Sequence, residues 1–275
     1  MSGLIFLILG FGALILGFIG EGGHATALIS WTSFVIVFGG TFGSLGTSFT
    51  LKQLKNIGSI LRVAFTRKST DLIELIFYFD HVLHKVRKDG FLGLEEELQE
   101  DENMNPFIKK GLQSAVDGVK PEDIRNMLEI EAAMSSKRHK TGASMFDSAG
   151  GTAPTMGIVG TVLGLVHVLG GLAKADMNAL GGSISAAFLA TLYGLGSANL
   201  IFLPIATRLK NLAKDEQLEK FIIIEAISLI QDNVSPTTLR DTLKGFLNTK
   251  DQNKLENRYF GTQNSELNKE EQQSA

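Results

Sequence analysis

Four long apolar blocks divide the sequence, and segments rich in charge separate them. The blocks are Gly3–Gly20, Ala27–Phe49, Ala153–Gly171 and Ile184–Pro204. A helix of about nineteen residues is about 28 Å long, which is close to the thickness of the hydrocarbon core of a bilayer. None of the four blocks contains Asp, Glu, Lys or Arg. The pattern therefore predicts an all-α polytopic membrane protein with four transmembrane helices and a helical cytoplasmic domain.

The basic residues set the expected orientation of these helices. Every Lys and Arg except Lys174 falls within residues 50–149 or after Pro204. The two hairpin tips, Glu21–Thr26 and Leu172–Ser183, are therefore almost free of positive charge. Because Lys and Arg are enriched in the cytoplasmic loops of membrane proteins, we expect both tips to face outward and both termini to lie in the cytoplasm.

The first block has an alternative interpretation as a cleaved signal peptide, because Ala25-Thr26-Ala27 looks like a cleavage site. Against this interpretation, Met1-Ser2-Gly3 contains no basic residue, and the apolar run is long for a signal peptide. We therefore expect the first two blocks to remain as helices that pack against the other spans through their small residues.

The charged segments show the three- and four-residue spacing of amphipathic helices. The expected helices run from about Thr70 to Asp89, from near Leu94 through Glu97, over Pro106–Val116, from Pro121 to about Ala149, and from Ser235-Pro236 to about Leu247. Glycine supplies the expected stop at Gly90, and Gly150-Gly151 is expected to break the helix before the third span. The fourth span should continue past Pro204 into the cytoplasm.

These boundaries divide the chain into five expected parts. Residues 1–49 hold the first two spans, 50–150 a helical cytoplasmic domain, 151–205 the third and fourth spans, 206–250 the cytoplasmic C-terminal helices and 251–275 a tail. The tail is polar and has few large apolar residues, so we expect it to be disordered.

Composition excludes several classes of function. The 26 basic and 29 acidic residues nearly balance, which argues against a nucleic-acid-binding surface over the whole protein. The chain has no cysteine, so disulfides, cysteine-bound zinc and thiol catalysis are excluded. A GxxxxGK[ST] phosphate-binding loop and an HExxH zinc motif are both missing from the sequence. We expect no enzymatic activity, cofactor or metal site.

The third and fourth blocks each carry a stripe of small residues with one threonine near the middle. Thr161 and Gly164 share a face of the third block, and Thr191 and Gly194 share a face of the fourth. One interpretation is a close helix contact in which each threonine bonds back to its own helix. The other is the lining of a hydrated ion route, where hydroxyl groups help to solvate the ion.

The absence of acidic residues from the four blocks bears on the second interpretation. Ion-driven membrane machines need a group that binds and releases the ion, usually a carboxylate. His167 is the only titratable candidate at depth, and we expect it to be a packing residue near the outer interface rather than a proton relay. If the protein conducts ions, another polypeptide must supply the carboxylate.

Several separated motifs carry a resemblance to a known family. They are APTMGIVGTVLGL at Ala153–Leu165, ATLYG at Ala190–Gly194 and NLIFLP at Asn199–Pro204, with GLEEEL and NPFIKKGLQSAVDG in the charged segment. In this order they resemble the MotA family of flagellar motor stator subunits, from the first span to about Leu247. The looser relatives ExbB and TolQ share the two-threonine arrangement but have three spans.

The resemblance implies a set of partners and a location. Members of the family form a pentamer around two copies of a single-span MotB-like subunit, which binds peptidoglycan and supplies the ion-binding aspartate. Cytoplasmic charges of the pentamer contact the rotor protein FliG. The implied location is the bacterial plasma (inner) membrane, and the proton is the expected ion because it is the commoner one in the family.

The resemblance also implies roles for individual residues. The family's rotor-contacting residues match Arg87 and Glu95, its coupling prolines match Pro154 and Pro204, and its ion-pathway residues match Thr161, Thr191 and Phe188. Glu96 and Glu97 adjoin Glu95, so the spacing alone selects Glu95. By themselves, without the resemblance, these charged residues are more typical of a solvated surface.

Two other functions remain as alternatives to a stator. An ExbB- or TolQ-like energiser of an envelope system would use a similar pair of threonines, although the four expected spans and the Arg87/Glu95 segment argue against it. An autonomous ion channel or transporter would need a carboxylate within the membrane, which this chain lacks.

Overall fold

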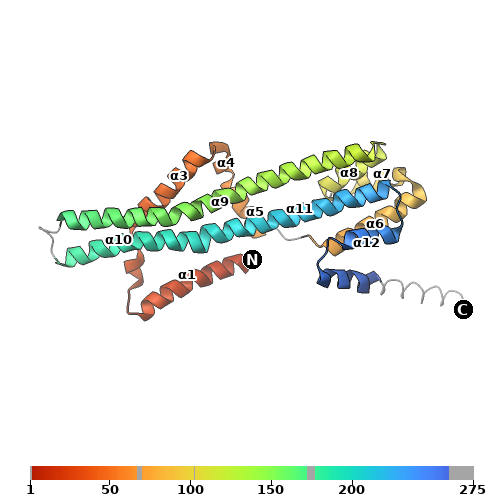
Figure 1. The fold of residues 1–275 in the computed structure, drawn as a ribbon. Coiled ribbons are helices and arrows are strands. Elements are labelled where there is room, and N and C mark those ends of the chain that lie inside the picture. The colour runs from red at the N-terminus through yellow and green to blue at the C-terminus, as the bar shows by residue number, and fades with distance from the viewer. Residues whose placement is uncertain (1, 67–69, 102, 172–176, 260–275) are drawn as a thin grey trace. The chain divides into compact units, whose positions relative to one another are not determined.

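A computed structural model describes residues 2–66, 70–101, 103–171 and 177–259 of the chain. Within those residues every regular element is a helix (Figure 1). The chain divides into two compact units. We call residues 1–68 with 137–213 the span unit, and residues 69–136 with 214–275 the head unit.

The span unit contains the apolar helices. They are α1 (Ser2–Gly20), the 3₁₀ turn η1 (Ala25–Leu28), α2 (Trp31–Phe34), the π-helical turn η2 (Val35–Gly39), α3 (Gly40–Ser48), α4 (Leu51–Lys55), α5 (Ile57–Thr66), and α10 (Met177–Ser197) followed by the π-helical turn η4 (Ala198–Phe202). Two long helices, α9 (Pro121–Gly171) and α11 (Leu203–Gln231), contribute to both units.

Three helical stretches in the described part of the chain are long and apolar enough to cross a membrane. They are Ala25–Ser48, α9 and the stretch Leu180–Gln231, and they contain the second, third and fourth predicted spans. The apolar stretch Ile5–Gly20 of α1 is shorter than these three. The all-α fold with membrane spans is therefore confirmed, whereas the crossing of the first block stays a prediction.

The predicted helix break at Gly150-Gly151 is wrong, because α9 runs without interruption from Pro121 to Gly171. Glycine lowers helix propensity by about 1 kcal/mol relative to alanine, but it keeps its backbone N–H and does not end a helix by itself. A Cβ at Gly150 would lie 2.5 Å from Leu203 Cδ2, so packing against α11 explains this glycine. Pro154 consequently lies inside α9 and does not open a separate helix.

The fourth span continues past Pro204, as predicted. The continuation is not uniform, because η4 occupies the turn just before this proline. A proline ring clashes with the carbonyl group four residues before it and leaves that group without its usual donor. The wider turn of a π-helix is a common way for a helix to absorb such a local irregularity.

The head unit holds the core of large aliphatic and aromatic side chains. Its elements are α6 (Leu72–Asp89), the 3₁₀ turn η3 (Phe91–Leu94), α7 (Glu95–Glu100), α8 (Pro106–Val116), α12 (Pro236–Lys244) and parts of α9 and α11. The bounds of α6 and α8 are close to those expected from the sequence. Phe79 of α6, Leu128 of α9 and Ile227 of α11 are among its fully buried residues.

The predicted disorder of residues 251–275 is wrong for the first part of that range. Residues 249–259 are helical and place Leu255 and Tyr259 in the head-unit core, where they are 0% and 8% exposed. The Tyr259 ring packs against Phe77, with 4.4 Å between ring centroids, and Arg240 lies over its face. Two core side chains one helical turn apart are therefore enough to order a polar segment. Residues 260–275 lie outside the described residues.

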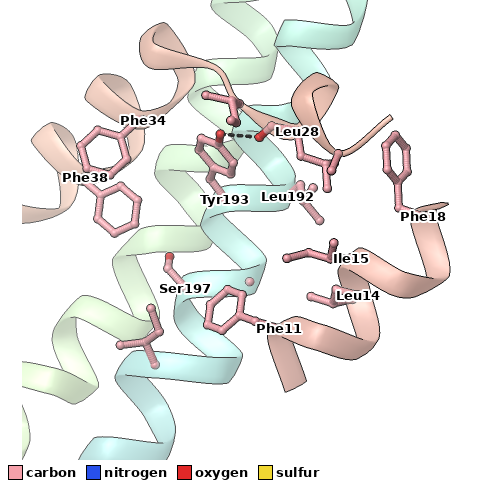
Figure 2. Close-up of a pocket in the computed structure, with 14 residues that line it drawn as sticks. Phe11, Leu14, Ile15, Phe18, Leu28, Phe34, Phe38, Leu192, Tyr193 and Ser197 are labelled. Carbon is pink, nitrogen blue, oxygen red and sulfur yellow. Dashed lines mark hydrogen bonds between the residues drawn. The ribbon is translucent and has the colours of Figure 1, made fainter. Parts of the chain in front are cut away.

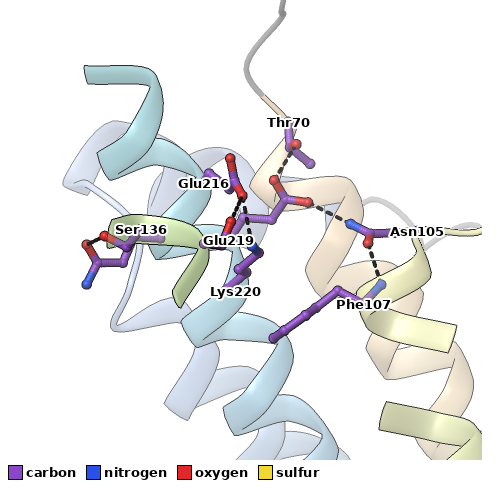
Figure 3. A network of polar contacts seen from close by, with 9 residues as sticks. Thr70, Asn105, Phe107, Ser136, Glu216, Glu219 and Lys220 are labelled. Atoms are coloured by element: carbon purple, nitrogen blue, oxygen red, sulfur yellow. Dashed lines mark hydrogen bonds and ion pairs between the residues drawn. The ribbon is translucent and has the colours of Figure 1, made fainter. Parts of the chain in front are cut away.

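Two buried glutamates of α11 hold the head unit together through polar contacts (Figure 3). Glu219 accepts hydrogen bonds from the Thr70 hydroxyl at 2.8 Å and from the Asn105 side chain at 3.0 Å. Asn105 also caps α8 by accepting from the backbone N–H of Phe107. Glu216 accepts from Ser135 and forms an ion pair with Lys220. The network fastens the starts of α6 and α8 to α11.

A Glu219→Ala substitution is expected to destabilise the protein by about 1.5–3 kcal/mol, because it removes the buried, charged acceptor of two hydrogen bonds. The matched control is Glu225→Ala on the same helix, which removes only a partly exposed ion pair with Arg125 and should cost at most about 1 kcal/mol. Chemical unfolding of the purified protein, followed by circular dichroism, measures both. An equal loss in the two variants would contradict the role assigned to Glu219.

Candidate functional site

Helices α9 and α10 make backbone contact along their small-residue stripes. A Cβ at Gly157 would lie 2.9 Å from the Ala190 carbonyl oxygen, and a Cβ at Gly194 would lie 2.6 Å from the Ala153 carbonyl oxygen. Real Cβ atoms do not approach other atoms so closely, so only glycine fits at these two positions. This contact confirms the predicted packing surface and sets the distance between the two helices.

The two predicted threonines meet at this contact. The hydroxyl oxygens of Thr161 and Thr191 lie 2.5 Å apart, and the Thr161 hydroxyl is also 2.9 Å from the Ala187 carbonyl oxygen. A further contact of 3.1 Å joins Thr161 to the carbonyl oxygen of Gly157 on its own helix. A hydroxyl carries one proton, so these acceptors compete for it. The site therefore combines the bond within the helix with a polar link across the two helices.

An exposed apolar surface surrounds the threonine pair. On α9 it includes Ile158 and Val162, which are 59% and 54% exposed, and on α10 it includes Phe188, which is 60% exposed. His167 is also exposed. The structure therefore places Phe188 on the outer surface of α10, one residue after the Ala187 carbonyl that contacts Thr161.

Tyr193 joins α10 to the start of α2, a contact that sequence reasoning missed. Its hydroxyl donates to the Leu28 carbonyl oxygen at 2.6 Å and accepts from the Ser30 backbone N–H at 2.9 Å (Figure 2). Ser33 adds a hydrogen bond to the Ala186 carbonyl oxygen. A tyrosine within an apolar block was a usable signal, because a buried phenol needs a polar partner.

An apolar cavity of about 540 Å³ lies beside Tyr193. Phe11, Leu14 and Ile15 of α1 line one side, and Leu192 of α10 lines another (Figure 2). The hydroxyl of Tyr193 is already bonded to backbone groups, so this cavity presents an almost entirely hydrocarbon surface.

The predicted charged pair flanks a tight turn in the head unit. Arg87 lies in the last turn of α6, Gly90 adopts φ 73°, and α7 begins at Glu95. Arg87 and Glu95 are both exposed. Leu94 and Leu98 are each 1% exposed and anchor the turn in the core. The fold thus holds two opposite charges in water on either side of a well-anchored turn.

The structure sets Glu97 apart from Glu95, two of the three adjacent glutamates that the sequence could not distinguish. Glu97 forms an ion pair with Lys85 at 2.8 Å, and this hydrogen bond raises the pKa of Lys85. Glu95 contacts only the neutral Gln99 side chain at 3.3 Å in the described part of the chain. Glu97 is therefore engaged within the protein, whereas the negative charge of Glu95 remains available to another molecule.

The remaining predicted site residues lie apart from these two clusters. Pro154 is inside α9 and Pro204 is at the start of α11, after η4. Among the residues that the structure describes, no group of three His, Asp or Glu side chains is arranged to hold a metal ion.

Comparisons with known proteins cover most of the chain. The MotA/TolQ/ExbB proton channel family model matches residues 99–221, and the motility protein A N-terminal family model matches residues 4–90. Motility protein A of Borreliella burgdorferi is 37% identical over 82% of this chain and 85% of its own. Motility protein A of Bacillus subtilis is 33% identical over 92% of this chain and 93% of its own. A solved structure of the flagellar MotAB stator complex from Bacillus subtilis superposes with a TM-score of 0.83 at 32% identity, covering 91% of this chain and 97% of that one.

Proposed function

The chain belongs to the MotA family of flagellar motor stator subunits, and on that premise we propose that it forms a proton route with a MotB-like partner and converts proton flow into torque on the rotor. Its relatives and structural neighbours are motility and stator proteins, so it is a stator subunit and not an ExbB- or TolQ-like energiser. It is a membrane protein and has no enzymatic role in the motor.

The contact between Thr161 and Thr191 is the observation that carries the proposed ion route. Two hydroxyls and a backbone carbonyl converge between apolar helices, in a chain whose spans contain no carboxylate. Such groups can solvate water or a passing proton, but they cannot bind and release it as an acid does. The MotB-like partner supplies an aspartate for that step, and Phe188 lines the route beside the threonines.

The exposed apolar surface of α9 and α10 supports an assembly around the partner. Its residues are too exposed to form the core of a single chain, and large apolar surfaces of this kind mark contacts with lipid or with other chains. In the proposed complex, five copies of the chain surround two MotB-like subunits in the plasma (inner) membrane, with both termini in the cytoplasm. This orientation follows the distribution of basic residues.

Two features connect ion flow with the rotor in this proposal. Pro154 and Pro204 each remove a backbone N–H and leave carbonyl groups available, so they are positions where α9 and α11 can bend. The exposed Arg87 and Glu95 of the head unit contact the rotor protein FliG through charges of opposite sign. Bending of the span helices in response to protonation of the partner then moves the charged turn against the rotor.

Valine substitutions of both threonines test the ion route. A Thr161→Val/Thr191→Val chain, expressed with its partner in cells without another stator, should reduce proton flux about tenfold or more. The reason is that the loss of a hydrogen bond to a charged group costs about 1.5–3 kcal/mol. Swimming speed and the change in cytoplasmic pH after energisation are the measurements.

The matched control is Thr155→Val, because Thr155 is an exposed threonine of the same helix whose hydroxyl bonds to Thr152. Cells that express this control variant should swim normally. Unchanged flux in the double variant would exclude the threonine route. Swimming that follows the sodium concentration and resists a protonophore would exclude the proton as the ion.

A further inference from the structure

Basic side chains gather in the segments of the span unit that adjoin the head unit in the sequence. In α4, α5, α9 and α11 they are Lys52, Lys55, Arg62, Lys137, Arg138, Lys140, Arg208 and Lys210. The described residues of the span unit contain only two acidic side chains, Glu21 and Asp147. Asp147 is paired with Lys210 at 2.6 Å. These segments therefore carry a large excess of positive charge.

Helix α5 lies against α9 and α11 through its apolar face. Ala64 is fully buried, and Ile60 packs against the same core. The guanidinium Nε–H of Arg208 donates to the Ala64 carbonyl oxygen and so fastens the end of α5 to α11. Val63 lies three residues after Ile60 on a neighbouring part of the same face and is 41% exposed. Helix α5 is therefore held against α9 and α11 along its apolar face.

A pocket of about 220 Å³ opens between α5, α9 and α11. Ser59, Arg138 and His139 form its polar edge, and Ile60, Leu209 and Leu212 form an apolar floor. The pocket is larger than a packing defect and combines positive charge with hydrocarbon, which a site for a purely soluble ion does not need.

We propose that this pocket binds an anionic phospholipid, with the lipid phosphate at Arg138, His139 and Ser59 and the adjoining hydrocarbon over the apolar floor. The pocket belongs to the unit that holds the membrane spans, and α4 and α5 follow the second span directly in the sequence, so the headgroups of the cytoplasmic leaflet are the nearest phosphate groups. The positive charge around it selects a headgroup with net negative charge over a zwitterionic one. The inference goes beyond the stator function and does not depend on the ion or on the rotor contact.

Native mass spectrometry of the purified complex of the chain with its partner tests this site. Phosphatidylglycerol or phosphatidylcholine with identical acyl chains is titrated against the wild type, Arg138→Gln and Lys140→Gln. Lys140 is an exposed basic residue two positions away on the same helix, and it does not line the pocket. We expect preferential retention of phosphatidylglycerol, an apparent affinity about fivefold lower for Arg138→Gln, and no change for Lys140→Gln.

Three results would overturn the proposal. Equal retention of the two lipids would exclude selection by headgroup charge. Equal weakening by Arg138→Gln and Lys140→Gln would indicate a diffuse attraction to basic residues and no defined pocket. Displacement of the lipid by soluble glycerol phosphate at the same molar concentration would show that the hydrocarbon contributes nothing. Because Arg138 is exposed, its substitution should leave the unfolding temperature of the complex unchanged.

Discussion

Replacement of Gly194 by alanine is expected to destabilise the protein and to stop swimming, although the change adds only one methyl group. The new Cβ would lie 2.6 Å from the Ala153 carbonyl oxygen and 3.1 Å from the Cα of Gly157, and neither backbone atom can move by rotating a side chain. Helices α9 and α10 must therefore separate. We expect a cost of about 1–3 kcal/mol, which is typical of overpacking in a tight core.

Gly196→Ala is the matched control for this prediction. It lies one half-turn further along α10, where a Cβ would meet nothing within 4 Å. Since alanine favours a helix over glycine by about 1 kcal/mol, this variant should be as stable as the wild type or more so. Thermal unfolding of the purified complex measures both changes. If the two variants are equally stable, backbone contact at Gly194 does not hold the helices together.

The effect on function should exceed the effect on stability. The hydroxyls of Thr161 and Thr191 lie 2.5 Å apart because the glycine contacts bring the two backbones together. A separation of about 1 Å would lengthen this contact beyond the range of an O–H···O hydrogen bond while both helices remain folded. Cells that contain normal amounts of the Gly194→Ala chain should therefore still fail to swim.

The sequence predicted the threonine pair because helical periodicity alone determines which residues share a face. Thr161 with Gly164, and Thr191 with Gly194, place a hydroxyl beside small residues on each helix. Only the pairing of these two faces required the structure. The end of α6 at Gly90 and the start of α8 at Pro106 were equally predictable, because glycine and proline act through local backbone geometry.

The incorrect predictions concern residues whose conformation depends on distant partners. Gly150-Gly151 has the composition of a helix break, but α9 continues through both glycines, and Gly150 packs against Leu203. Residues 249–259 are polar, yet Leu255 and Tyr259 find places in a core built from helices far away in the sequence. Local propensity cannot anticipate such contacts, since tertiary packing routinely overrides it.

The polar contacts that sequence reasoning missed share the same origin. Glu219 looks like one charge among many on α11, and only its distance to Thr70 and Asn105 shows that it is a buried acceptor. The choice between Glu95 and Glu97 also needed the structure, because Lys85, two residues before Arg87 on α6, forms an ion pair with Glu97. The sequence shows where charged residues lie along the chain, and the structure shows which of them already have an ion-pair partner.

Reversal of the two charges that the fold leaves exposed is expected to abolish swimming with no loss of protein. Arg87→Glu and Glu95→Arg, singly or together, bring like charges against a rotor surface that fits the natural pair, and such contacts cost several kcal/mol. Both side chains are exposed, and neither has an ion-pair partner in the described part of the head unit. Immunoblotting and thermal unfolding should therefore match the wild type, while swimming of cells without another stator is lost.

Lys120→Glu is the control, because Lys120 is an exposed basic residue of the head unit in the connection between α8 and α9, outside the turn between α6 and α7. It makes the same change in net charge as Arg87→Glu. Cells with this variant should swim normally, which would separate an effect of net charge from an effect of the charge at position 87. A charge reversal on the rotor protein that restores swimming to Arg87→Glu cells would identify the contacting residue. Normal swimming in the double variant would exclude this turn as the rotor contact, because the charge at each of its two positions then has the opposite sign.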